Sequence, residues 1–104
     1  MAALGLKSIV TTIGTSITAI GSGLAFSDCW VMADPGNSGT LYLGGADVSS
    51  SNGMVLSKTT PQKLPKNESR GSNESYNLAK CFAIGTDSAD KIRVMYAIVD
   101  NSAP

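Results

Sequence analysis

The chain is 104 residues long, enough for one domain with a single hydrophobic core and too short for two. Eight basic and eight acidic residues cancel, and charged residues are only 15% of the chain, so its electrostatics favour neither nucleic acid nor an anionic membrane as partner. Histidine is absent, and the two cysteines, Cys29 and Cys81, are too few for a disulfide scaffold or a zinc site. We predict no nucleic-acid partner, no membrane association, no cofactor and no metal.

The N-terminal part of the chain has a composition of its own. Residues 8–27 carry no charge, and this window is as long as a transmembrane span or a signal peptide. It is rich in Ser, Thr and Gly, which makes it too polar for hydrocarbon, and its β-branched residues favour extended structure. We predict an N-terminal arm over residues 1–8 and a single β-domain over residues 9–104, with a cleaved signal peptide as the disfavoured alternative.

The first clear strand is FSDCWVMA, residues 26–33, whose side chains alternate between two faces. Trp30 and Met32 lie on the face opposite Cys29, so neither face is plainly a solvent face. The strand ends at Asp-Pro-Gly-Asn, residues 34–37, a strong turn because proline fixes φ and the aspartate can bond the backbone two residues on.

The middle of the chain combines short strands with a polar segment. Residues 39–45 predict a short strand, and an Asn52-Gly53 pair predicts a tight hairpin before the next apolar run. Residues 57–75 are nearly devoid of apolar side chains, so we predict a long exposed loop in which only Leu64 offers an anchor.

Two strong strands follow this loop. Residues 77–85 and 91–99 are predicted to pair as a hairpin joined by residues 86–90, with Gly85 and Asp87 as turn residues. The last strand alternates between two faces, and its second face is amphipathic rather than polar, which indicates that something covers part of it. With no convincing helix, the pattern predicts an all-β fold, a small β-sandwich or jelly roll of about six to eight antiparallel strands.

No arrangement of side chains predicts catalysis. The usual base for a Ser or Cys nucleophile is missing, and the Asp87 and Asp90 pair is explained by its turn. Asp34, Asn37 and Asp47 could offer oxygen ligands, but their spacing matches no calcium motif. We therefore expect a non-enzymatic protein that works by binding other protein.

The expected binding surface combines the uncharged arm with apolar side chains that face away from the predicted core. The protein-interface residues that we predict are Leu4, Leu6, Trp30, Met32, Leu64 and Met95. For Trp30, Met32 and Met95 a second interpretation stays open, in which the chain covers them with its own arm as ordinary core.

The chain from Trp30 onward resembles a group of small structural proteins of tailed bacteriophages. In that group an A-x-x-x-N-x-G-x-x-Y-x-G-G-x-x-V stretch is followed by N-G-x-x-L and a terminal I-G…V-x-V-x-Y segment. The matching residues here are Ala33, Asn37, Gly39, Tyr42, Gly44, Gly45, Val48, Asn52, Gly53, Leu56, Ile84, Gly85, Ile92, Val94 and Tyr96. The resemblance covers about the last three quarters of the chain. The chain departs from the group's pattern between Leu56 and Leu78, where its segment is longer and more charged than the short turn of the group.

The resemblance implies a virion component with a β-sandwich fold, assembled in the cytoplasm of a bacterial host. We expect a capsid cement or decoration protein that binds the major capsid protein or another virion protein, as a homo-oligomer, trimer or dimer. The alternative is a tail, baseplate or head-fibre adaptor of the same virion. A carbohydrate-binding β-module ranks last, because such a site uses a row of exposed aromatic rings and only Trp30 is available.

Overall fold

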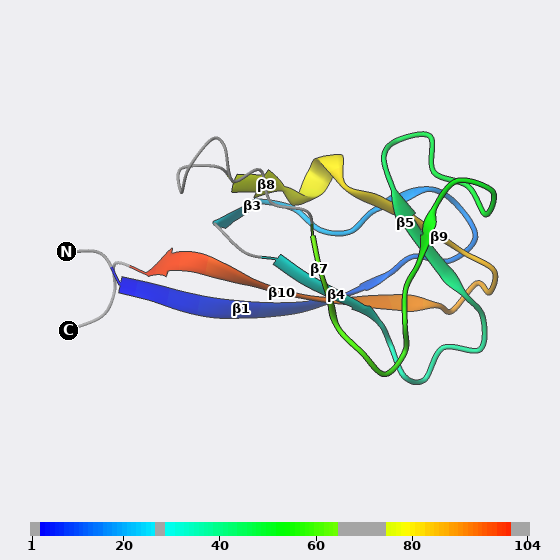
Figure 1. Cartoon of the computed structure of the whole chain (residues 1–104), viewed down its shortest axis with the longest axis horizontal. Helices are drawn as coiled ribbons and strands as arrows, with labels where there is room; N and C mark the ends of the chain where they lie inside the picture. Colours follow the sequence, from blue (N-terminus) through cyan, green and yellow to red (C-terminus); the bar gives the residue numbers. More distant parts are fainter. Residues whose placement is uncertain (1–2, 27–28, 65–74, 101–104) are drawn as a thin grey trace.

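The structure, a computed structural model, describes residues 3–26, 29–64 and 75–100 (Figure 1). Within these ranges the chain forms ten strands and a 3-10 helix, η2 (Leu78–Lys80). The strands are β1 (Ala3–Thr12), β2 (Thr18–Ala19), β3 (Leu24–Phe26), β4 (Cys29–Ala33), β5 (Leu41–Gly44), β6 (Met54–Val55), β7 (Gln62–Lys63), β8 (Ser75–Asn77), β9 (Phe82–Gly85) and β10 (Lys91–Asp100). Several strands are only two or three residues long, so there are more of them than the predicted six to eight.

The strands form two four-stranded sheets and one small sheet. The first sheet has the order β1-β10-β4-β7, the second has the order β2-β9-β5-β6, and β3 pairs with β8. Every described pair is antiparallel. This arrangement confirms the predicted all-β class and fits a small antiparallel β-sandwich.

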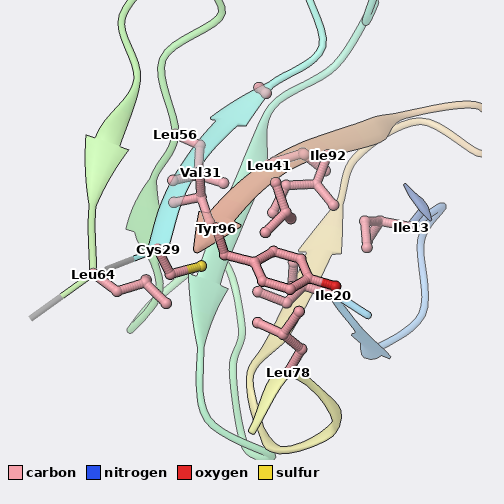
Figure 2. Packing of buried hydrophobic residues seen from close by; sticks show 13 residues of the cluster. Ile13, Ile20, Cys29, Val31, Leu41, Leu56, Leu64, Leu78, Ile92 and Tyr96 are labelled. Carbon is pink, nitrogen blue, oxygen red and sulfur yellow. The ribbon is translucent and has the colours of Figure 1, made fainter. Parts of the chain in front are cut away.

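The hydrophobic core draws on both four-stranded sheets (Figure 2). Val31, Ile92 and Val94 come from the first sheet, and Leu41 and Ala83 come from the second. Fully burying an aliphatic side chain contributes about 1.5–3 kcal/mol, so these contacts hold the two sheets together. The complete cluster comprises Ile13, Ile20, Cys29, Val31, Ala33, Leu41, Leu56, Leu64, Leu78, Ala83, Ile92, Val94 and Tyr96.

The predicted alternation of strand faces is confirmed in β4 and β10. In β10, Ile92 and Val94 are buried while Arg93 and Met95 are exposed, and in β4 Val31 is buried between more exposed neighbours.

The turn after β4 is also as predicted. The backbone N–H of residue 37 donates to the carbonyl of residue 34 at 3.0 Å, and the carboxylate of residue 34 accepts from the N–H of residue 36 at 3.0 Å. The strand predicted over residues 26–33 is instead two strands, because Phe26 belongs to β3, which pairs with β8.

The hairpin predicted between residues 77–85 and 91–99 is wrong. β9 pairs with β2 and β5, whereas β10 pairs with β1 and β4, so residues 86–90 cross from one sheet to the other. The buried carboxylate of Asp90 holds this corner, because it accepts from the backbone N–H of Gly39 at 3.1 Å and of Asp87 at 3.2 Å. β1 offers β10 a ten-residue partner, which the four residues of β9 cannot match.

The segment predicted as a free arm is part of the first sheet. β1 pairs with β10 from Ala3 opposite Asp100 to Thr12 opposite Lys91. The pairing of β10 with β4 ends where Tyr96 lies opposite Cys29, so the described ends of β1 and β10 continue beyond it as a two-stranded ribbon (Figure 1). Residue 8 therefore marks no structural boundary, because the backbone groups of β10 find their partners along the whole of β1.

Three local predictions for loops and strands also need correction. Residues 59–61 and 63 are exposed, as predicted, but both ends of the segment 57–64 are hydrogen-bonded to β4: the N–H of Ala33 donates to the carbonyl of Ser57 and the N–H of Leu64 to that of Cys29, both at 2.9 Å. The part of the predicted loop over residues 65–74 lies outside the described residues. The Asn52-Gly53 pair is the end of a nine-residue connection, residues 45–53, rather than a two-residue turn. η2 interrupts the strand predicted over residues 77–85, and the Asn77 side chain caps it by accepting from the N–H of residue 79.

Candidate protein-docking face

The first sheet has one face on the core and one face that no described segment covers. We call the second face the outer face. The register places Ser8, Met95, Trp30 and Lys63 in one row across β1, β10, β4 and β7. The row on one side of it contains Val10, Arg93 and Met32. The row on the other side contains Leu6 and Ala97. A row across four strands brings together side chains that are far apart in the sequence.

The outer face is apolar over much of its area. Leu6 is 71% exposed, Val10 is 60% exposed, and Trp30 and Met95 are each 39% exposed. A contiguous apolar surface of this kind indicates a binding site more strongly than scattered exposed side chains do. The outer face is therefore the best candidate for a site of protein association.

A groove of about 330 Å³ is hollowed into the outer face, and its surface is almost wholly apolar. Its lining includes Val10, Trp30, Met32, Pro61, Arg93 and Met95. The groove gives the face a concave shape into which an apolar side chain of a partner can insert.

Two cationic side chains accompany the apolar surface. Arg93 Nε donates to Asp34 Oδ1 at 2.7 Å, and this hydrogen bond, with one from the N–H of Gly36, holds the pKa of Asp34 below its ordinary 3.8. The Asp34 carboxylate therefore stays charged and balances Arg93 at neutral pH. Lys63 Nζ lies 5.8 Å from the centroid of the Trp30 ring, a cation–π contact that helps fix the indole.

The structure brings together four of the six predicted interface residues. Leu6, Trp30, Met32 and Met95 all belong to the outer face. Leu64 does not, because it is buried in the core and is not available to a partner. The sixth, Leu4, lies in β1 opposite Val99, and the structure does not describe its side chain.

The sequence interpretation missed Val10 and Pro61 as parts of this surface, and it placed Arg93 on the same strand face as Met95 without naming it as an interface residue. Leu6, Ser8 and Val10 alternate with a period of two, which would have placed Val10 beside Leu6 had the segment been interpreted as a strand. The covering of Trp30 and Met95 by the chain's own arm is not seen, because described residues 3–12 lie at the edge of the sheet.

The two acidic side chains considered as catalytic groups, Asp87 and Asp90, accept hydrogen bonds from the backbone. Asp90 accepts from two N–H groups, and Asp87 Oδ1 accepts from the N–H of residue 89 at 2.9 Å. Among the described residues, no three His, Cys, Asp or Glu side chains gather where they could hold a metal ion. The same part of the chain contains no helix of the length and hydropathy needed to cross a membrane.

The two cysteines are free thiols with different exposure. Cys29 is buried in the core, and burial, with a smaller contribution from Cys81, raises its pKa to about 12. Burial also raises the pKa of Cys81, which is only partly buried. Both thiols are therefore protonated at neutral pH.

We expect Cys29 to resist alkylation in the folded protein. A pKa raised from 9.0 to about 12 lowers the reactive thiolate about 1,000-fold, and burial also blocks the reagent. The test is iodoacetamide labelling of the Cys81→Ser variant at pH 8, followed by intact mass, with and without urea. Labelling of the folded variant at the rate of the unfolded one would show that Cys29 is not held in the core.

Comparison of the chain with known protein families, with curated proteins and with solved structures finds no match.

Proposed function

We propose that this chain is a non-enzymatic virion structural protein, a capsid cement or decoration protein that binds the head of a tailed bacteriophage. The outer face of the first sheet carries this proposal, because Leu6, Val10, Trp30 and Met95 present an apolar surface that no described segment covers. The sequence resemblance supplies the setting, a particle assembled in the bacterial cytoplasm, and the partner, the major capsid protein or another virion protein.

The outer face has the composition of a protein-binding surface. Trp30 and Arg93 are of the residue types that most often dominate the energy of protein interfaces, and methionine is also enriched there. The described charges of this surface are few, and Arg93 already has its carboxylate partner. Docking against a protein shell would remove apolar area from water without leaving Arg93 unpaired.

We expect Trp30→Ser to weaken binding to capsid shells by about 30-fold, the effect of losing about 2 kcal/mol at an interface anchor. Shells that lack the protein would be mixed with purified variants, and bound protein would be measured by co-sedimentation. The melting temperature of the shell, which the wild-type protein should raise, provides a second readout.

Met54→Ser is the matched control for this experiment. Met54 is 62% exposed, but it lies in β6 of the second sheet, away from the outer face. Its replacement should leave shell binding unchanged. Equal binding by the Trp30→Ser variant would remove the outer face from the interface. If wild-type protein binds no shell and its deletion abolishes adsorption of the virus to its host, the tail or baseplate assignment replaces the cement assignment.

A further inference from the structure

We propose that the open edge of β1 binds β1 of a second copy of this chain, antiparallel and with a two-fold axis at Ser8. β1 is one of the two edge strands of the first sheet, and no described segment pairs with its other side. The pairing would join two sheets into one of eight strands. It goes beyond the docking of the outer face and does not depend on it.

The hydrogen-bond pattern shows which backbone groups point to the open edge. The N–H of Ile13 donates to the carbonyl of Asp90 at 2.8 Å, in continuation of the register between β1 and β10. Because hydrogen-bonded pairs alternate along an antiparallel ladder, odd-numbered residues of β1 face β10. The N–H of Asp34 donates to the carbonyl of Lys91 on the β4 side, which agrees with this phase. The N–H and C=O groups of Ser8 and of the other even-numbered residues of β1 therefore point to the open edge of the sheet.

The side chains of β1 select one register for this pairing. With Ser8 opposite Ser8 of the second copy, Leu6 lies opposite Val10, and residues 4–12 of both strands are aligned. Moving the axis to Lys7 would place two ammonium groups opposite each other, which is unfavourable. Moving it to Ile9 would align fewer residues. An axis between residues would pair the outer face of one copy with the core face of the other.

The edge of β1 is suited to a second copy of the same chain. Natural edge strands are protected by proline, bulges, short length or several charges, but β1 has ten residues, no proline and one charge, Lys7. Lys7 would lie opposite Ile9 of the second copy, and the net charge of the chain is zero, so the copies do not repel. A two-fold axis uses the same edge twice and closes the assembly. It also brings Leu6 and Val10 of both copies side by side in one continuous apolar surface.

The mass of the protein in solution tests the pairing. Sedimentation equilibrium should give twice 10.7 kDa for the wild type. Ser8→Pro should give a monomer, because proline removes an N–H that points to the open edge while the hydrogen bonds to β10 remain. Ser8→Ala keeps that N–H and should remain a dimer. A monomeric wild type, or a dimer that Ser8→Pro does not dissociate, would overturn the proposal.

Disulfide trapping tests the register without relying on proline. In a Cys81→Ser background, Ser8→Cys should cross-link two copies under mild oxidation, since a hydrogen-bonded pair has Cα atoms about 5.5 Å apart. Lys7→Cys is the control and should not cross-link, because residue 7 does not meet its own copy. Cross-linking of the Lys7→Cys variant but not of the Ser8→Cys variant would exclude this register. If Ser8→Pro fails to fold, the cross-linking result alone tests the pairing. A dimer that binds no shell would count against the proposed function alone, and a monomer that binds shells would count against this pairing alone.

Discussion

Replacement of Asp90 by alanine is expected to lower the free energy of unfolding by about 3 kcal/mol. Asp90 is fully buried, and its two carboxylate oxygens accept from the backbone N–H groups of Gly39 and Asp87. Alanine would leave both donors without a partner and would open a void at the crossing from β9 to β10. Urea denaturation followed by Trp30 fluorescence would measure the loss.

Asp87→Ala is the matched control for Asp90→Ala. Its carboxylate also accepts a backbone hydrogen bond in this turn, from residue 89, but that bond is exposed, so the loss should stay below about 1 kcal/mol. Asp90→Asn should fall between the two variants, since one oxygen remains and the new amide group faces a donor. Equal effects of Asp90→Ala and Asp87→Ala would show that the buried carboxylate does not hold the corner.

The second large effect is expected for Gly85→Ala, which should lower the free energy of unfolding by about 2–3 kcal/mol. A Cβ atom at this position would lie 2.7 Å from the carbonyl oxygen of Gly14 and 3.0 Å from Leu41 Cδ2. The carbonyl belongs to the backbone and accepts from the N–H of Gly85 at 2.8 Å, so it cannot move away without loss of that bond. Gly85 is needed for close approach and not, as the sequence interpretation had it, for a turn.

Gly45→Ala provides the comparison for Gly85→Ala. Gly45 is exposed, and the nearest atom to an added Cβ would be 3.5 Å away, an ordinary contact. We expect a change within about 0.5 kcal/mol, measured in the same urea titration. If both alanine variants unfold at the same urea concentration, the close approach at Gly85 is not a constraint on the fold.

The faces of individual strands could be predicted from sequence, but most strand pairing could not. Alternation in β4 and β10 is a local property, and it correctly separated Trp30 and Met95 from the core. Pairing depends on contacts between distant segments. The sequence near Gly85 favoured a hairpin, and nothing local revealed that β1 fits β10 over ten residues.

The candidate docking face shows the same division between local and distant information. Leu6, Met32 and Met95 were predicted one by one as interface residues, yet only the register of three strands places them on one surface. Leu64 was predicted both as the anchor of its loop and as an interface residue, because a single apolar residue in a polar segment does not reveal whether it turns inward. Its backbone bond to Cys29 directs it into the core.

The central position of β10 in the first sheet has a consequence for the order of folding. β10 is the last described strand, yet it lies between β1 and β4, which are made much earlier in synthesis. The first sheet therefore cannot assemble while the ribosome is still making the residues of β10. Loop closure over most of the chain makes such folding slow, on the millisecond-to-second scale typical of domains dominated by non-local contacts. Until β10 is made, neither edge of β1 has a strand partner in the described part of the chain, so the hydrogen-bonding groups of β1 must be satisfied by water.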